Sequence, residues 1–149
     1  MKLVGWGFFW QDLVLGERYR TINRTLTETD LVNFISVTGM LETIFIDSTF
    51  EAGSIKGRFV PAALSYTLIE GLQCQSLFQG TGLALLEVEK KVLNPVMVGD
   101  TIHGEIEILG VKPTSKGNRA VVTSMNDVIN QNGDKVISYK AVRMMAGRG

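Results

Sequence analysis

The spacing of apolar residues changes once along this chain, from helical in the first half to alternating in the second. The first helical stretch is short. Thr27, with Asp30 three residues later, predicts an N-terminal capping box for a helix that runs through Val37. Gly39 is then expected to end this helix, because glycine readily adopts the left-handed conformation of a helix C-terminus.

A second, longer and mostly apolar helix is predicted in the middle of the chain. Pro61 suits its first turn, where a missing amide costs nothing, and the glycines of 80–82 are expected to stop it after about Phe78. Between the two helices, we expect 47–52 to form a single helical turn and 53–57 to form a flexible loop.

From Leu83 onward, alternating apolar and polar residues predict an antiparallel sheet. Asn132-Gly133 suits a tight hairpin turn between the last two strands. The four expected strands run from Leu83 to Leu93, Val98 to Val111, Arg119 to Ile129 and Lys135 to Met145. Because an apolar helix is not stable alone on a surface, we expect the sheet to cover it, which places the chain in the α+β class.

Composition limits the classes of function. A chain of 149 residues with 45% apolar content fits one domain, residues 1–149. Fifteen basic residues balance fifteen acidic ones, so no net field attracts nucleic acid or an anionic membrane. No apolar run approaches the roughly 20 residues of a membrane-spanning helix, and the first residues lack an export signal, so we expect a cytoplasmic protein. With one cysteine and one histidine, no spacing supports a metal site.

One loop carries the strongest indication of function. Residues 38–47 read Thr-Gly-Met-Leu-Glu-Thr-Ile-Phe-Ile-Asp. This resembles the acid-base loop Ser/Thr-Gly-Asp-x-Asn-Pro-x-His-x-Asp of MaoC-like, (R)-specific enoyl-CoA hydratases, a branch of the hot dog superfamily. Residues 10–17 and 25–34 are similar to the opening of that family, and 94–102 are similar to its Pro-Val-x-x-Gly-Asp-Thr strand entry. The resemblance implies a hot dog fold, in which a curved antiparallel sheet wraps around a central helix.

The resemblance also implies catalytic positions, and two of them have changed. Thr38, Gly39 and Asp47 match the family loop, while Met40 stands where the family has its catalytic Asp and Phe45 where it has its catalytic His. In the family, that pair activates the water that adds across the double bond of a 2-enoyl thioester. Neither replacement can transfer a proton, so hydration by the usual pair is excluded by this alignment.

Three carboxylates are candidates for a replacement chemistry. Glu42 lies two residues from Met40 beside an apolar run, although a solvated loop carboxylate is the alternative. Asp47 is expected to order the loop or to cap the following turn. Glu70 lies eight residues, about two helical turns, after Ala62. Some hot dog acyl-CoA thioesterases resemble this arrangement, with an acidic helix residue as nucleophile or base. The alternative for Glu70 is a carboxylate that reaches solvent or a partner subunit.

The start of the long helix is the expected substrate site. In the family that this chain resembles, the amide at this point holds the thioester oxygen, and Ala62 takes the position of the family's glycine. The Ala62 amide can still donate, because a helix N-terminus presents unpaired N–H groups and a favourable dipole. We therefore expect Pro61, Ala62 and Ala63 to bind substrate. Arg58 is expected to meet the phosphates of coenzyme A, with a solvated loop residue as the alternative.

The sequence thus predicts a homodimer or higher oligomer that binds an acyl-CoA or acyl-carrier thioester, without a metal and without a cofactor beyond the coenzyme A of the substrate. Three functions stay open: a hydratase that uses Glu42, a non-catalytic acyl-CoA-binding subunit of a dehydratase complex, and a thioesterase that uses Glu70. His103 is expected on the exposed, polar face of its strand, and Cys74 is expected to be buried and inert.

Overall fold

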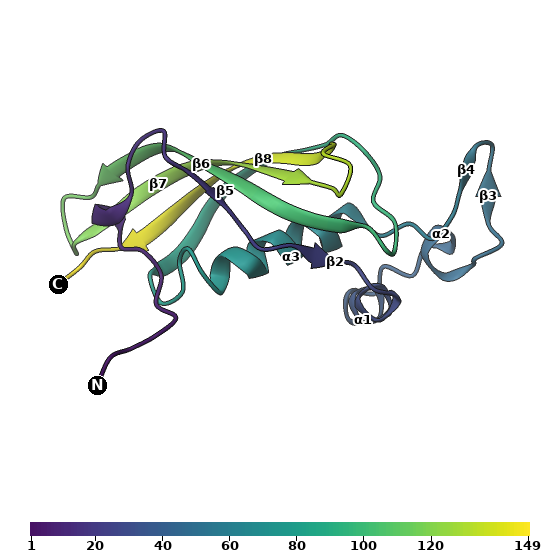
Figure 1. Ribbon diagram of the computed structural model, residues 1–149, viewed down its shortest axis with the longest axis horizontal. Coiled ribbons are helices and arrows are strands. Elements are labelled where there is room, and N and C mark those ends of the chain that lie inside the picture. Colours follow the sequence, from purple (N-terminus) through teal and green to yellow (C-terminus); the bar gives the residue numbers. More distant parts are fainter.

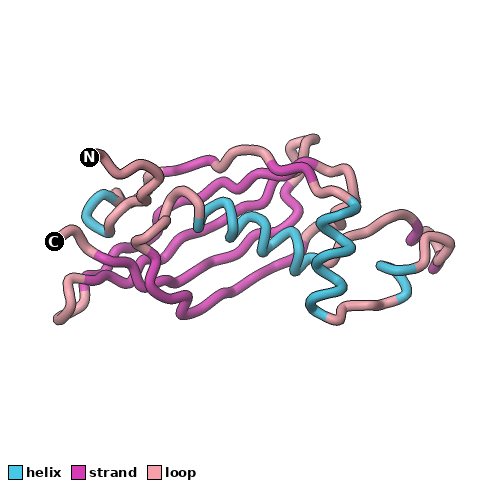
Figure 2. Tube along the Cα trace, turned by 90° about the horizontal axis from the view of Figure 1, so that it is seen from below, coloured by secondary structure: helices cyan, strands magenta, loops and turns pink.

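A computed structural model describes all 149 residues, and its largest element is one antiparallel sheet with a helix lying along one face (Figure 1). The strand order is β1-β6-β7-β8-β5, and β2 also pairs with β6. The strands are β1 (Arg18–Arg20), β2 (Arg24–Thr25), β5 (Gly82–Val92), β6 (Thr101–Pro113), β7 (Arg119–Ile129) and β8 (Lys135–Ala146). Figure 2, seen from below, shows α3 (Ala62–Cys74) crossing in front of this sheet. The predicted α+β arrangement is confirmed.

The main core lies between α3 and the sheet. Leu64 and Ile69 on α3 are at most 4% exposed, and they belong to the same apolar cluster as Ile102, Val128 and Tyr139 on the strands. Gly104 on β6 allows this close approach, because a Cβ there would lie 2.9 Å from Cγ2 of Ile69.

The first predicted helix is confirmed as α1 (Glu28–Thr38). Its capping box is complete: the Asp30 amide donates to Thr27 Oγ1 at 3.1 Å, and the Thr27 amide donates to Asp30 Oδ2 at 2.9 Å. Gly39 follows with a φ of 74°, the left-handed conformation that ends the helix.

The expected helical turn over 47–52 is wrong. The turn lies earlier, in α2 (Thr43–Ile46), and Asp47 directly follows it. The Asp47 carboxylate accepts hydrogen bonds from both the amide and the hydroxyl of Thr49, which directs the chain out of the helix. The expected loop over 53–57 is part of a hairpin, in which β3 (Glu51–Ala52) pairs with β4 (Ile55–Lys56). This hairpin projects beyond the sheet at the end that carries α1 and α2 (Figure 1).

Three further expectations need correction. α3 ends at Cys74 instead of near Phe78, and Pro61 caps it from outside the first turn. Cys74 is exposed, since it lies on the last turn of α3 and borders a hollow in the surface. His103 does lie on the polar side of β6, but only 8% of it is exposed, because the Arg20 side chain approaches its ring and Glu105 bonds it at 2.9 Å.

The remaining element is a short 3-10 helix, η1 (Trp10–Asp12), near the start of the chain. None of the helices combines the length and the apolar run that crossing a lipid bilayer requires.

Candidate functional site

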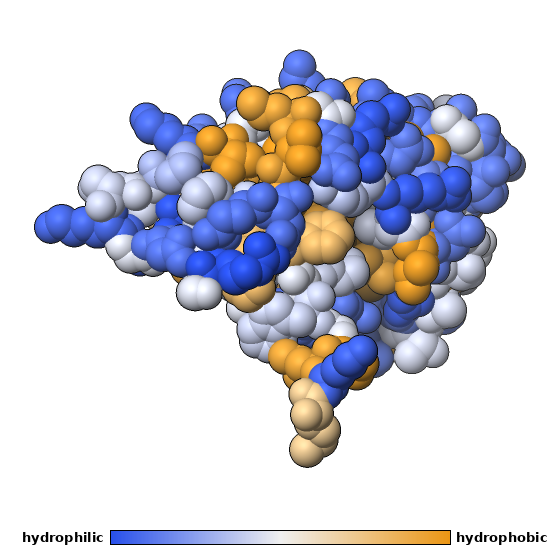
Figure 3. All heavy atoms as spheres, turned by 60° about the vertical axis from the view of Figure 1, so that its left-hand side comes forward, coloured by the Kyte–Doolittle hydropathy of each residue, from blue (hydrophilic) through white to orange (hydrophobic).

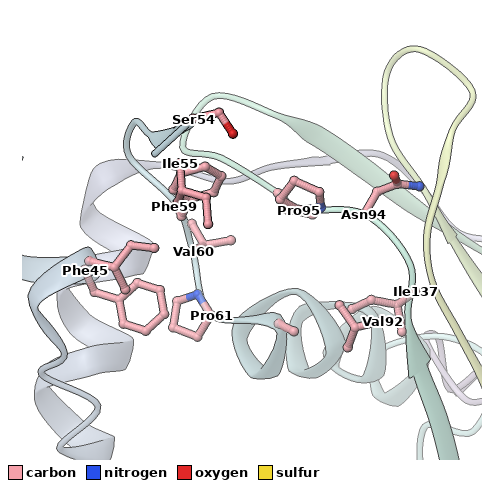
Figure 4. A pocket seen from close by; sticks show the side chains of 13 residues that line it. Phe45, Ser54, Ile55, Phe59, Val60, Pro61, Val92, Asn94, Pro95 and Ile137 are labelled. Carbon is pink, nitrogen blue, oxygen red and sulfur yellow. The ribbon is translucent and has the colours of Figure 1, made fainter. Parts of the chain in front are cut away.

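A cavity of about 520 Å³ opens at the start of α3, between that helix and the hairpin end of the molecule (Figure 4). Its walls come from α2, the β3–β4 hairpin, the segment before α3, the end of β5 with the loop that follows, and β8. The lining residues are Ile44, Phe45, Ser54, Ile55, Phe59, Val60, Pro61, Ala62, Val92, Asn94, Pro95, Val96 and Ile137. Ser54 and Asn94 are the two polar side chains in this lining, and no lining side chain titrates.

The backbone fixes the approach to α3. The Val60 amide donates to the Val96 carbonyl at 3.0 Å, and the Val98 amide donates to the Arg58 carbonyl at 2.9 Å. Pro61 then caps the helix without a side-chain hydrogen bond, so the amides of Ala62 and Ala63 keep their hydrogen-bonding capacity. Pro61 and Ala62 line the cavity, whereas Ala63 does not. The cavity therefore meets an unpaired amide at the positive end of a helix dipole.

Met40 and Phe45, which the resemblance predicts to stand at the catalytic positions of the family, both have apolar surroundings. The Phe45 side chain is 9% exposed, belongs to the main core and also lines the cavity, where its ring lies close to Pro61 (Figure 4). Met40 is half-buried against the same core and is not part of the lining. The structure thus brings one of the two positions to the cavity wall.

The three candidate carboxylates lie at three separate places, and none lines the cavity. Glu42 is exposed, precedes α2 and makes no side-chain capping hydrogen bond. Asp47 is also exposed, and the hydroxyl and amide of Thr49 lower the pKa of its carboxyl group. Asp47 therefore orders the turn into the hairpin, as one of its two predicted roles requires.

Glu70 lies in a polar network between α3 and β8. Its Oε2 accepts from Arg143 Nη2 at 2.5 Å and from the Tyr139 hydroxyl at 2.9 Å. The side chains of Glu70 and Arg143 are 15% and 9% exposed. Burial, and next the negative charge of Glu70, raise the pKa of Tyr139, which keeps this phenol protonated as a donor.

A second hollow, of about 350 Å³, opens beside this network. Glu70 and Cys74 border it from α3, Arg143 borders it from β8, and Leu85 borders it from β5. No hydrogen bond reaches Oε1 of Glu70, so the carboxylate retains one unpaired oxygen.

Arg58 lies between elements and does not line the cavity. Its Nε and Nη2 donate to the Glu28 carboxylate of α1, the shorter bond being 2.6 Å, and its Nη1 donates to the Phe45 carbonyl of α2. The Glu28 carboxylate raises the pKa of Arg58, and the pKa of Glu28 is lowered in turn. The guanidinium group therefore ties α1 and α2 to the segment before α3, and phosphate binding by Arg58 stays a prediction.

No protein-family model matches the chain, and no curated protein matches its sequence. The structure is similar to a MaoC-like dehydratase from Rhodospirillum rubrum, with 23% identity over 96% of this chain and 99% of that one and a TM-score of 0.84. It is also similar to the R-hydratase PhaJ1 from Pseudomonas aeruginosa, with 24% identity over 95% and 88% of the two chains and a TM-score of 0.77.

A third similar structure is a Mycobacterium tuberculosis protein with a double hotdog fold. The identity is 17% and the TM-score 0.86, over 99% of this chain and 46% of that one. The chain has the hot dog fold. In this hot dog fold α3 is the central helix, and the cavity lies at its N-terminus.

Several residues of the site were not found from the sequence. Ser54 and Ile55 reach the cavity from the tip of the hairpin, and Ile137 reaches it from β8. No local pattern marks these residues, because they come from segments far apart in the chain. Asn94 and Pro95 did lie in the motif at 94–102, and their place in the cavity wall gives that motif a role in the site.

Proposed function

We propose that this chain is a MaoC-like protein that binds acyl thioesters and does not itself hydrate them. The proposal depends on the lining of the 520 Å³ cavity, which is mostly apolar and contains no titratable side chain. Ala62, whose amide is free, is part of this lining. An apolar cavity favours an acyl chain by the hydrophobic effect, and the amide favours the thioester oxygen at its mouth.

The same lining argues against hydration. Adding water to a double bond needs a group that takes a proton and a group that returns one, and such general acid-base assistance is typically worth roughly 10² to 10⁴ in rate. Glu42, the nearest replacement in the loop, is exposed to solvent and stands outside the lining. Phe45 occupies the wall with a ring that neither accepts nor donates a proton.

The sheet has an unpaired edge strand, β5, to which a second hot dog unit could pair. β5 is the edge strand of the sheet and is exposed over almost all of its 11 residues, including Leu83, Leu85 and Leu86. The first part of β5, with its exposed leucines, is an unpaired apolar edge, and such an edge favours pairing with another strand. The similar Mycobacterium tuberculosis protein contains two hot dog units in one chain, and we propose that this chain pairs with a second copy or with a catalytic homologue through β5.

Calorimetry with saturated and 2-enoyl-CoA thioesters tests the binding, and loss of the enoyl absorbance tests the hydration. We expect the unmodified protein and the Glu42→Gln variant both to bind the thioesters, and neither to hydrate them above the rate measured without protein. Ala62→Pro removes the amide at a position where proline is tolerated, because Pro61 is already extended with a ψ of 140°. This variant should bind roughly three- to tenfold more weakly, whereas Ala62→Gly, which keeps the amide, should not. Equal binding by all three proteins would reject the role of the amide.

A thioesterase is the second candidate, and the unpaired Oε1 of Glu70 beside the 350 Å³ hollow favours it. The Arg143 ion pair argues against it, because a paired carboxylate is a weaker base and nucleophile. Release of free thiol from acyl-CoA, lost in Glu70→Gln, would establish this activity. Absence of thiol release from the unmodified protein would exclude it.

A further inference from the structure

A separate hollow of about 410 Å³ lies near the other end of α3, between the N-terminal segment, β1 and the residues that follow α3. Figure 3 views the molecule from this end, where hydrophobic side chains gather in patches separated by hydrophilic ones. Backbone hydrogen bonds hold the N-terminal segment in place, from the Gly7 amide to the Gln79 carbonyl and from the Phe8 amide to the Leu77 carbonyl, both at 2.8 Å. The hollow is therefore built by a fixed segment.

Three aromatic side chains form one part of its wall. Phe8 and Tyr19 are in contact, with ring centroids 5.6 Å apart and planes inclined at 50°. Trp6 also lines the hollow. Its ring lies so close to Gly80 that a Cβ added to Gly80 would be 2.4 Å from the nearest ring atoms. Trp6 nevertheless keeps half of its surface exposed, so ring surface is available to a ligand.

The polar part of the wall is cationic. Arg20 lines the hollow. Five of the seven arginines form ion pairs with acidic side chains, and the two that do not are Arg20 and Arg119. The hydrogen bonds of Arg20, to Asn23 at 3.4 Å and to His103 at 3.5 Å, are both long and use Nη2 alone. The remaining donors of the guanidinium group are free to bind an anion, and Gln75 lies in the same wall.

The phenol in this wall does not repel an anion. Burial, followed by the effect of Glu17, raises the pKa of Tyr19 to about 12, so the ring stays uncharged near neutral pH. A flat, neutral aromatic surface beside a free guanidinium group matches a ligand that combines an aromatic ring with a phosphate.

We propose that this hollow binds a nucleoside phosphate, with the base stacked on Trp6 and the neighbouring rings and the phosphate bound by Arg20. Free mononucleotides and the nucleotide end of coenzyme A share this chemistry. The site is distinct from the acyl cavity, because the 13 residues of α3, about 20 Å in length, separate the two. It does not depend on the function proposed for that cavity.

Tryptophan fluorescence tests the proposal directly, because Trp6 lies in the wall. The Trp10→Phe background leaves Trp6 as the one tryptophan of the chain. AMP should quench its fluorescence saturably, Arg20→Gln should weaken AMP binding about tenfold, and adenosine should bind equally to both proteins. Arg119→Gln, which alters the other arginine without an acidic partner, is the matched control and should change neither ligand.

Coenzyme A distinguishes the two sources of the nucleotide. Affinity for coenzyme A equal to that for AMP identifies a free nucleotide as the ligand, and clearly tighter binding of coenzyme A identifies its nucleotide end. Either result supports the site. No saturable quenching by AMP at millimolar concentrations, or equal AMP binding by the Arg20→Gln variant, would overturn the proposal.

Discussion

Removing the Glu70 carboxylate is expected to cost this protein more stability than removing any exposed acidic side chain. The Glu70–Arg143 pair is 2.5 Å long, and its side chains are 15% and 9% exposed. Glu70→Ala leaves the guanidinium group buried without its counter-ion and takes an acceptor from the Tyr139 hydroxyl. Breaking a buried pair in this way typically costs about 3–5 kcal/mol. For a chain of this size, that loss lowers Tm by roughly 6–20 °C.

Urea denaturation followed by far-UV circular dichroism measures this loss. Glu89→Ala is a matched control, because the Lys140–Glu89 pair is 3.3 Å long but lies at the surface, with Glu89 74% exposed. That variant should lose about 0–1 kcal/mol. The double variant Glu70→Leu/Arg143→Met removes both charges and should recover most of the stability. If Glu70→Ala loses no more than Glu89→Ala, the buried pair does not stabilise the helix–sheet contact as argued.

Two further predictions concern the first half of the chain. Burial raises the pKa of Asp30, but the hydrogen bonds from Arg24 and from the cap of α1 outweigh burial, so the folded pKa is lowered. The stability that Asp30 contributes is therefore present above its unfolded pKa, which is near 3.9. This stability is lost as the pH falls through the folded pKa. Asp30→Asn should therefore flatten the fall in unfolding free energy below about pH 4, and an unchanged fall in urea titrations would contradict this. Gly80→Ala should cost about 1–3 kcal/mol and displace Trp6, because Gly80 has a φ of 74° and no space for a Cβ. Gly53→Ala, with a φ of 63° but open surroundings, isolates the backbone contribution, and equal losses in the two variants would refute the steric part.

The parts of the fold that follow local rules could be predicted from the sequence. The cap of α1, its glycine stop and the alternation of β7 each depend on residues within a few positions of one another. The bounds of β7 agree with the prediction at both ends. These elements were predictable because backbone capping and side-chain alternation are set by neighbouring residues.

The errors arise where a distant segment decides the outcome. His103 was placed correctly on the polar side of its strand, but its burial depends on Arg20, which comes from β1. Glu70 was recognised as a helix carboxylate, but its partner Arg143 lies 73 residues further along the chain. The turn at Asp47 was misplaced because its carboxylate bonds Thr49 instead of capping a helix.

The candidate site was predictable in its location and not in its composition. Pro61 and Ala62 were expected at the mouth of the site and do line the cavity, whereas Arg58 binds Glu28 and the carbonyl of α2. Glu42 was the expected substitute for the Asp and His of the family that this chain resembles, and its exposed position outside the lining depends on where α2 begins. Loop residues without a regular pattern gave no means of predicting that position.

Binding without hydration can be measured on one preparation of the unmodified protein, by calorimetric titration with a saturated acyl-CoA and by an enoyl-CoA hydration assay. We expect saturable binding of the acyl thioester, and no hydration by the unmodified protein above the rate measured without protein. Robust hydration by the unmodified protein would contradict the proposal, and its loss in Glu42→Gln would identify Glu42 as the proton carrier.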